Sequence, residues 1–317
     1  MRDAGYRGRF APSPTGPLHL GSLVAALASW LDARAHGGRW LVRIEDIDPP
    51  REQAGAARAQ LEALTALGLT PDQPPTYQSA HSKRFEQAVA ALQTAGQLYR
   101  CTCSRSAVEQ AALLLAGRPD VYPGTCRDLQ RTALRAALRV RVPADRVGFV
   151  DRACGEFWQA LKSEVGDFVV LRADGLWAYQ LAVVVDDGAQ QITDVVRGAD
   201  LLDNTPRQIH LQRLLGLPTP RYLHVPMVLN EAGEKLSKQT GAAPLELADP
   251  VGQLEQAWRW LGFAATGAAT VSEFLTHALR AWQERWVASP DRVDTMRPES
   301  PSTLQPGVLI GSNERQQ

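Results

Sequence analysis

The sequence predicts an α/β fold built around a parallel sheet. The chain has 317 residues, 44% of them hydrophobic, so it is long enough to bury a large core. Residues 9–22 are typical of a short apolar strand, a turn with three prolines and Gly16, and the start of a helix. A helix over about 20–35 and an apolar strand over 39–46 complete a strand–helix–strand unit. Such units form parallel sheets with right-handed crossovers.

The overall charge excludes attraction of nucleic acid by the protein as a whole. The formal net charge is zero and the pI is about 7.0, so contacts with RNA require local patches. No apolar run approaches the roughly 18 residues of a membrane span, and the N-terminus has no apolar signal core. We therefore expect a cytoplasmic protein without membrane contact. Thiols stay reduced there, so the four cysteines are interpreted as metal ligands or buried thiols.

The turn into the first helix predicts an anion site. Backbone N–H groups at a helix start have no partners within the helix, and the helix dipole adds partial positive charge. This geometry suits phosphate binding. His19 adds a donor for a phosphoryl oxygen, and Gly21 allows a flat ring to approach the backbone. The alternative interpretation is a plain helix start.

Glu45 follows the second predicted strand. It lies at the carboxyl end of a parallel strand, the edge where open α/β sheets bind ligands. The alternative is a capping acid, because the Asp-Pro-Pro stretch at 48–50 starts the next helix. We expect helices over 51–68 and 77–96.

Three cysteines have the spacing of metal ligands. Cys101 and Cys103 lie on one side of an extended segment, and Cys126 can supply a third thiolate. No histidine lies between Cys103 and Cys126. The fourth ligand is then Tyr122, four residues before Cys126, with Asp120 as the alternative. The competing interpretation is three reduced cysteines packed as small apolar residues.

Four arginines after the cysteines recur every four residues. On a helix they would form one basic stripe, which either follows an RNA backbone or faces solvent. They are Arg127, Arg131, Arg135 and Arg139.

Charged residues in the second half of the chain fit an amino acid with two carboxylates. Residues 167–187 contain two apolar runs joined by Ala-Asp-Gly, which predicts a hairpin whose second strand, with Tyr179, returns to the main sheet. The next strand ends at Arg197. With Arg9, it gives two guanidinium groups for two carboxylates, and Glu45 can bind an ammonium group. Glutamate matches this set of charges, and the residues leave open which arginine reads the side-chain carboxylate.

The remaining segments predict mostly helices. One starts at Asn204 or Thr205, and two more lie over 254–261 and 272–286 with tryptophans on their apolar sides. From about residue 290 the composition is typical of a disordered tail.

Two motifs together resemble a known family. RFAPSPTGPLHLGS at 9–22 and KLSKQ at 235–239 are similar to the two phosphate-handling motifs of the class I aminoacyl-tRNA synthetases, in the glutamyl branch. The RIED string that contains Glu45 and the Cys-x-Cys…Tyr-x3-Cys pattern fit the same branch. Gln239 stands where the family has a serine, and Ala199 stands where it usually has an acid.

The resemblance implies a Rossmann-like, parallel-sheet class I synthetase catalytic domain with a zinc-containing insertion and a small C-terminal helical subdomain. We expect these parts in chain order: the first half of the catalytic domain (1–99), the insertion (100–165), the second half (166–234), the lysine loop with the helical subdomain (235–289) and the tail (290–317).

The resemblance also implies residue roles. His19 and Lys238 would be catalytic. ATP would bind with Mg²⁺ at His19, Gly21, Lys235 and Lys238. Glutamate would bind at Arg9, Phe10, Ala11, Pro12, Ser13, Glu45, Tyr179 and Arg197. One structural zinc per chain would be held by Cys101, Cys103, Tyr122 and Cys126.

The segment after Lys238 is too short for anticodon-binding domains, so the chain resembles the short glutamyl-Q branch of this family. This implies ATP-dependent activation of L-glutamate without tRNA, then transfer to the queuosine base at the wobble position of tRNA(Asp). We expect a monomer. The alternatives are a truncated glutamyl-tRNA synthetase that charges the tRNA 3′ end and a paralogue without catalysis.

Overall fold

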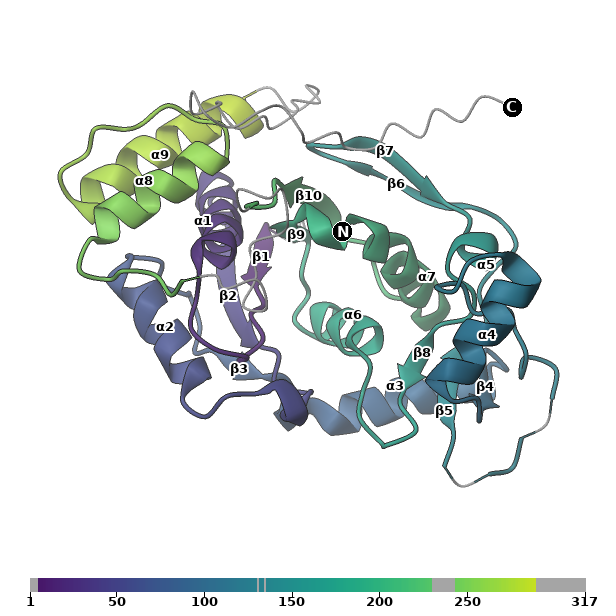
Figure 1. The fold of residues 1–317 in the computed structure, drawn as a ribbon. Helices are drawn as coiled ribbons and strands as arrows, with labels where there is room; N and C mark the ends of the chain where they lie inside the picture. The colour runs from purple at the N-terminus through teal and green to yellow at the C-terminus, as the bar shows by residue number, and fades with distance from the viewer. Residues whose placement is uncertain (1–4, 130, 134, 230–242, 289–317) are drawn as a thin grey trace.

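The computed structural model describes all residues except 1–4, 130, 134, 230–242 and 289–317 (Figure 1). The strands are β1 (Arg7–Phe10), β2 (Arg39–Ile44), β3 (Thr76–Tyr77), β4 (Leu98–Cys101), β5 (Ala137–Val140), β6 (Val147–Asp151), β7 (Gly155–Gln159), β8 (Val169–Leu171), β9 (Asp194–Gly198) and β10 (Arg221–Val225). The α-helices are α1 (Leu20–Ala35), α2 (Ala56–Ala66), α3 (Ser82–Thr94), α4 (Arg105–Ala116), α5 (Leu161–Glu164), α6 (Tyr179–Ala189), α7 (Thr205–Leu215), α8 (Pro250–Trp260) and α9 (Val271–Trp286). Short 3-10 helices are η1 (Pro49–Arg51), η2 (Gln78–His81) and η3 (Ala199–Asn204).

The centre of the fold is a parallel sheet made by two segments of the chain. Strands β1, β2 and β3 pair in parallel, and β9, β10 and β6 form a second parallel set with β7 antiparallel at its edge. The carbonyl of Arg7 in β1 accepts a hydrogen bond from the amide of Thr193 (3.0 Å), so the two sets adjoin beside β9. Strands β4, β5 and β8 form a separate antiparallel sheet. The predicted strand–helix–strand unit and its parallel sheet are confirmed.

Each face of the central sheet carries its own core. Leu23 and Leu27 of α1 pack with Val42 of β2 on one face, and Trp258 and Trp282 of α8 and α9 cover α1 from outside. The buried tryptophans confirm the predicted apolar sides of the last two helices. On the opposite face, α3, α6 and α7 bury a second core (Figure 1).

Asp32 of α1 joins elements that are distant in the sequence. Its carboxylate is fully buried and accepts hydrogen bonds from Tyr6 Oη (2.6 Å), Arg152 Nη1 (2.6 Å) and Trp282 Nε1 (3.0 Å). Burial acts to raise the pKa of Asp32, but the bonds from Arg152, Tyr6 and Trp282 outweigh burial and lower it. Asp32 is therefore ionised in the folded protein and ties α1 to α9 and to the turn after β6.

The structure corrects the predicted second strand of a hairpin over 167–187. Only Val169–Leu171 forms a strand, and the second apolar run is helix α6. Residues 180–187 of α6 are all buried, so the helix shows no polar stripe from which its 3.6-residue period could be read. Because valine is common in strands, its run of valines led to the wrong prediction of a strand.

The expected helices over 51–68 and 77–96 are shorter in the structure. Helix α2 begins at Ala56 because the Asp-Pro-Pro stretch forms η1 first. Residues Thr76–Tyr77 form β3, and Gln78 begins η2 rather than the following helix. Buried Gln78 donates to Asp186 of α6 (3.1 Å), so this turn is fixed by a tertiary contact.

The predicted basic stripe is wrong. Residues 125–129 form turns, and Arg139 lies in strand β5 rather than on a helix. Arg127 pairs with Asp167, and the Arg139 guanidinium stacks over the Tyr122 ring at 3.7 Å. These arginines therefore serve different local contacts. Within the described residues, no helix has the length and apolar character that a membrane span requires.

Replacing Asp32 by asparagine should lower the free energy of unfolding by about 3 kcal/mol, because Arg152 loses its charged partner in a buried site. The Asp32 pKa is lowered in the folded state, so this stabilisation is present above the unfolded pKa of about 3.9 and is lost on further acidification. Urea unfolding at neutral and acidic pH measures both effects. Glu62→Gln is the control, because its pair with Arg58 is exposed (3.7 Å) and should contribute less than about 0.5 kcal/mol. Equal stability of Asp32→Asn and wild type at neutral pH would contradict this role.

Candidate active site

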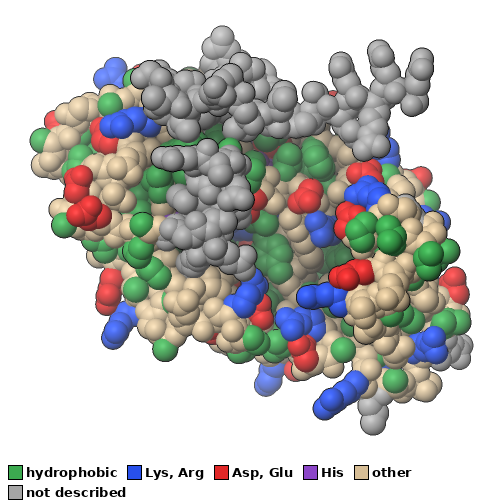
Figure 2. Space-filling view, in the orientation of Figure 1, with side chains coloured by type: hydrophobic (Ala, Val, Ile, Leu, Met, Phe, Trp, Pro, Cys, Tyr) green, Lys and Arg blue, Asp and Glu red, His purple; other side chains and the backbone are tan. Residues whose placement is uncertain are grey.

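Alternation along the parallel strands places charged side chains on one face of the central sheet. In β2, Trp40, Val42 and Ile44 belong to the core under α1, so Arg43 and Glu45 lie on the opposite face. The same alternation brings charged or polar residues of β1, β9 and β10 to this face, namely Arg9, Arg197 and His224. The molecule is hollowed beside β1 and α6, with charged side chains around the hollow (Figure 2). The sheet therefore has one apolar face under α1 and an opposite face on which these charged side chains lie beside a second apolar core.

A buried network joins two arginines and two carboxylates on this face. Arg9 donates from Nε to Asp187 Oδ1 (3.1 Å) and from Nη2 to Oδ2 (3.2 Å). Arg43 Nη1 lies 2.8 Å from Asp187 Oδ1, and Arg43 Nη2 donates to Glu45 Oε1 (3.3 Å). None of the four side chains is more than 8% exposed. Asp187 engages Nε and Nη2 of Arg9, and no acceptor for Nη1 is found among the residues that the structure describes.

The two carboxylates of the network differ in their pKa. Burial acts to raise the pKa of Asp187, but Arg9 and Arg43 outweigh burial and lower it. For Glu45, burial is the larger effect, and its pKa is raised although Arg43 and Arg9 act in the opposite direction. The ionised state of Glu45 therefore depends on the neighbouring guanidinium groups.

Arg197 lies at the carboxyl end of β9, as predicted, and all its N–H groups have protein acceptors. Its contact with Tyr179 Oη is the longest of them. The acceptors are His224 Nε2 (3.1 Å), Gln208 Oε1 (2.8 Å), Thr205 Oγ1 (2.8 Å), the Leu201 carbonyl (3.3 Å) and Tyr179 Oη (3.4 Å). Arg197 can therefore bind a carboxylate only by exchanging one of these partners.

His224 orients Arg197 as a neutral imidazole. Burial lowers its pKa, and its Nδ1 lies 2.6 Å from Asp151 Oδ2. The pKa of Asp151 is lowered despite burial, mainly by the bond with His224, so its carboxylate is an acceptor and Nδ1 must carry the proton. Nε2 is then an acceptor, in agreement with its bond from Arg197.

Tyr179 is the first residue of α6 and interacts with the charged residues predicted for the amino-acid site. Burial raises its pKa, and the charges of Arg197, Glu45 and Arg9 all act on it. These four residues were predicted from widely separated segments, and the structure places them within one electrostatic environment.

His19 is the N-cap of α1. Its Nδ1 accepts a hydrogen bond from the Ser22 amide (3.3 Å), and Ser22 Oγ accepts one from the His19 amide (2.8 Å). The proton of a neutral His19 ring therefore lies on Nε2. Gly21 is the second residue of the helix. The Leu245 amide donates to the Leu18 carbonyl (3.1 Å), so the chain that follows 230–242 returns beside this helix start.

The segment from Phe10 to Ser13 offers mainly its backbone to a ligand. The Phe10 side chain is buried in the core and stacks on Trp40, with ring centroids 6.4 Å apart. The Pro12 carbonyl accepts from the Glu45 amide (2.9 Å), while Ala11 is partly exposed and Ser13 is exposed. Lys235 and Lys238, the predicted triphosphate contacts, lie outside the described residues.

The three predicted cysteines form a compact cluster. The Sγ atoms of Cys101, Cys103 and Cys126 lie within 4.8 Å of one another. Sulfurs that share a tetrahedral zinc lie about 3.8 Å apart, so the cluster could hold a metal ion. Burial acts to raise the pKa of Cys126, but hydrogen bonds from the Thr102 backbone and Cys103 lower it to about 7. The pKa of Cys103, in contrast, is raised to about 12, mainly by burial. Three cysteine sulfurs this close together are a donor set suited to a metal that prefers thiolates.

Tyr122 lies beside this cluster. Its Oη is 3.4 Å from Cys101 Sγ and accepts from the Cys126 amide (2.9 Å). Asp120, the alternative ligand, is exposed and pairs with Arg118 (2.9 Å). The geometry favours Tyr122 as the fourth donor.

Sequence reasoning missed Arg43, Asp187 and His224. Arg43 carries a readable signal, because it lies two residues before Glu45 and therefore on the same face of the strand. The Asp186–Asp187 pair at the end of an apolar run was also unusual enough to suggest buried ion pairs. His224 has no such signal, since its partner Asp151 is 73 residues away.

Comparisons with known proteins agree with this geometry. The family described as tRNA synthetases class I (E and Q), catalytic domain, matches residues 6–258. A glutamyl-Q tRNA(Asp) synthetase of Cupriavidus metallidurans is 55% identical over 309 residues, which cover 96% of this chain and 98% of that protein. A protein of the same name from Burkholderia mallei is 58% identical over 288 residues, which cover 89% of this chain and 97% of that protein.

A solved structure has the same fold. A glutamate tRNA ligase from Elizabethkingia meningosepticum, crystallised with its amino acid, gives a TM-score of 0.66 at 27% identity. The match covers 75% of this chain and 52% of the ligase, so the chain spans about half the length of that protein. The chain belongs to the class I tRNA synthetases of the E and Q type, in the branch of the glutamyl-Q tRNA(Asp) synthetases.

Proposed function

We propose that the chain activates L-glutamate with ATP to glutamyl-adenylate without tRNA and then transfers the glutamate to the queuosine base at the wobble position of tRNA(Asp). The transfer step follows the printed names of its relatives, which are glutamyl-Q tRNA(Asp) synthetases. In the first step the α-carboxylate of glutamate attacks the α-phosphate of ATP and pyrophosphate leaves. This needs positioning and charge stabilisation but no covalent enzyme intermediate.

The charge of the buried cluster is the observation that carries the proposal. Arg9, Arg43 and Arg197 supply three guanidinium groups, and Glu45 and Asp187 supply two carboxylates. Glutamate brings two carboxylates and one ammonium group, so guanidinium groups of this cluster can pair with both carboxylates and Glu45 with the ammonium group. Glutamine has a neutral amide in place of the side-chain carboxylate and would leave one buried guanidinium without its anionic partner, which disfavours it in a low-dielectric site.

Each group then has a defined role. Glu45 binds the ammonium group of glutamate, and Nη1 of Arg9 donates to one of its carboxylates. Tyr179 and Arg197 contact the other carboxylate. The hydrogen bond between these two side chains is the longest that Arg197 makes, so it is the one that Arg197 exchanges for a bond to the carboxylate. The stretch Phe10, Ala11, Pro12 and Ser13 lines the amino acid mainly through its backbone.

ATP binds at the start of α1. The backbone of Gly21 faces the adenine or ribose, and His19 donates from Nε2 to a phosphoryl oxygen. Lys235 and Lys238 neutralise the triphosphate as pyrophosphate leaves, and Mg²⁺ enters with the nucleotide. Lys238 and His19 are thus the catalytic residues.

The cysteine cluster binds one structural zinc per chain, with Tyr122 as the fourth ligand. A dication favours ionisation of the phenol, which otherwise titrates near pH 10. The metal stabilises a region whose own apolar cluster is small. We further propose that the enzyme acts in the cytoplasm as a monomer.

Labelled glutamate distinguishes the proposal from its alternatives. Incubation with glutamate and ATP alone should give ATP–pyrophosphate exchange, and exchange should be absent with glutamine. With tRNA from queuosine-containing cells, nuclease mapping should place the label on the anticodon fragment, and tRNA from queuosine-deficient cells should stay unlabelled. Label on the 3′-terminal adenosine would show a truncated glutamyl-tRNA synthetase. Absence of exchange would show a protein without this catalysis.

Glu45→Gln should raise KM for glutamate about 10- to 150-fold, because a hydrogen bond between charged groups contributes about 1.5–3 kcal/mol. KM for ATP should stay nearly constant, since Glu45 contacts the amino acid. Steady-state exchange kinetics measure both constants, and the exposed Glu62→Gln serves as the matched control. An unchanged KM for glutamate would remove Glu45 from the ammonium site.

Cys126→Ser should lower bound zinc well below one ion per chain and reduce Tm, because tetrahedral structural sites need all their ligands. Metal analysis and thermal unfolding measure the two effects. Cys154→Ser is the control, since Cys154 lies outside the cluster. Tyr122→Phe should weaken zinc binding while Asp120→Asn should not. The reverse result would identify Asp120 as the fourth ligand.

A further inference from the structure

Arg43 is a fully buried cation that the roles given above do not use. Its side chain has no solvent exposure, and its Nε has no hydrogen-bond partner among the described residues. Leu41, on the same face of β2, shows that this face accepts an apolar side chain. Replacing a buried ion pair by apolar residues is often neutral or stabilising, so the fold alone does not explain a guanidinium here.

Two contacts of Arg43 lead to groups that shape the proposed amino-acid pocket. Nη2 reaches Glu45 Oε1 (3.3 Å), and Nη1 reaches Asp187 Oδ1 (2.8 Å). Asp187 in turn holds Arg9 through two of its nitrogens. Arg43 therefore lies between Glu45, the proposed partner of the ammonium group, and Arg9, the proposed partner of a carboxylate.

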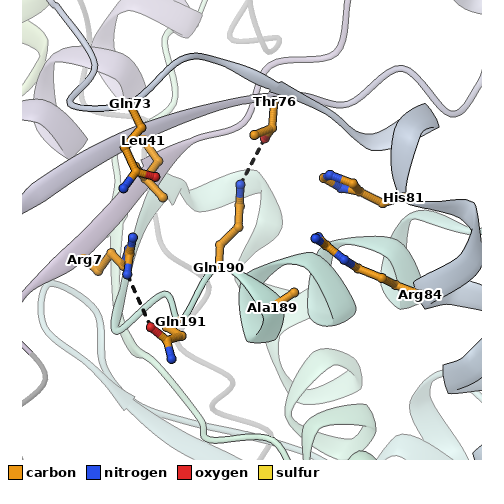
Figure 3. A pocket seen from close by; sticks show the side chains of 9 residues that line it. All are labelled: Arg7, Leu41, Gln73, Thr76, His81, Arg84, Ala189, Gln190 and Gln191. Atoms are coloured by element: carbon orange, nitrogen blue, oxygen red, sulfur yellow. Dashed lines mark hydrogen bonds between the residues drawn. The ribbon is translucent and has the colours of Figure 1, made fainter.

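Arg43 also fixes the end of α6. Its Nη1 donates to Gln190 Oε1 (2.6 Å), and Gln190 Nε2 donates to Thr76 Oγ1 in β3 (3.0 Å). Figure 3 shows Gln190 reaching across to Thr76 at the wall of a cavity of about 250 Å³. Because α6 carries Tyr179 at its start and Asp187 near its end, this contact sets the position of both relative to the sheet.

We propose that Arg43 is a positioning residue of the amino-acid pocket, which fixes Glu45 directly and Arg9 through Asp187. This inference rests on the proposed roles of Glu45 and Arg9 in glutamate binding. Arg43 does not touch the substrate. It keeps the carboxylates of Glu45 and Asp187 ionised and oriented. Glu45 and Arg9 then keep the relative positions that the ammonium group and a carboxylate of glutamate require.

Kinetics of Arg43→Gln and Arg43→Lys test the proposal. Arg43→Gln should raise KM for glutamate about 100-fold while KM for ATP changes less than about two-fold. Arg43→Lys keeps the positive charge, but one ammonium group cannot reach both Glu45 and Asp187 as the two Nη atoms of the guanidinium do. KM for glutamate should therefore rise about ten-fold in this variant. Should Arg43→Gln fail to fold, Arg43→Lys decides the question by the same two constants.

The pH profile supplies a readout that a purely structural role would not change. The groups facing Glu45 are Arg43 on β2, Arg9 on β1, and Asp187 and Tyr179 on α6. Binding of the ammonium group requires ionised Glu45, so kcat/KM for glutamate falls as pH falls through the Glu45 pKa. Loss of Arg43 removes a nearby positive charge, so the acid limb should move up by about one pH unit or more.

Arg152→Gln is the matched control. Arg152 is also a mostly buried arginine that pairs with an aspartate, but its partner Asp32 belongs to the contact that ties α1 to the turn after β6. The Arg152→Gln variant should have a lower Tm and an unchanged KM for glutamate. If the Arg43 variants raise KM for glutamate and KM for ATP in proportion and also lower Tm, the effect is a general structural defect and the proposal is overturned. Wild-type kinetics in Arg43→Lys would overturn it as well. If wild-type protein shows no glutamate-dependent exchange, the proposed function itself fails.

Discussion

The constraint on which the site depends is the joint burial of opposite charges between β1, β2 and α6. A single carboxylate or guanidinium removed from water at this depth is strongly unfavourable. Arg9, Arg43, Glu45 and Asp187 are stable there only as a set, because each cation contacts an anion and each anion a cation. The set therefore fixes the relative positions of three elements that are distant in the sequence.

The rest of the fold makes this set possible. The two-residue period of the strands directs apolar side chains toward α1, while the face toward α6 carries the charged side chains beside a second apolar core. Asp32 connects α1 to α9 and to Arg152, which secures the apolar side. Both faces of the sheet thus contribute to the core, and the face toward α6 also carries the residues of the proposed substrate site.

The sequence allowed the strand–helix–strand unit, the positions of Glu45 and Arg197 at strand ends and the cysteine cluster to be predicted. These features depend on local spacing, which a chain displays directly. Helix α6 was predicted wrongly as a strand, because a helix buried on all sides shows no amphipathic period. Asp187 and His224 act through tertiary contacts whose partners are far away in the sequence, and Arg43 reaches Asp187 in the same way, although its pairing with Glu45 two residues away was readable. The roles of Lys235 and Lys238 stay predictions from the motif alone.

The same contacts hold the side chains of the proposed glutamate site in place in the absence of ligand. Arg9 and Arg197 are held by protein partners, so little side-chain freedom remains to be lost on binding. The charged groups of the proposed site are already desolvated in the folded protein, and its guanidinium groups can pair with the two carboxylates of a dicarboxylic amino acid. A neutral side-chain amide would leave one of them without that partner. In the proposed site, glutamate is therefore selected by several buried charges acting together, and contact with any single arginine is only one part of that selection.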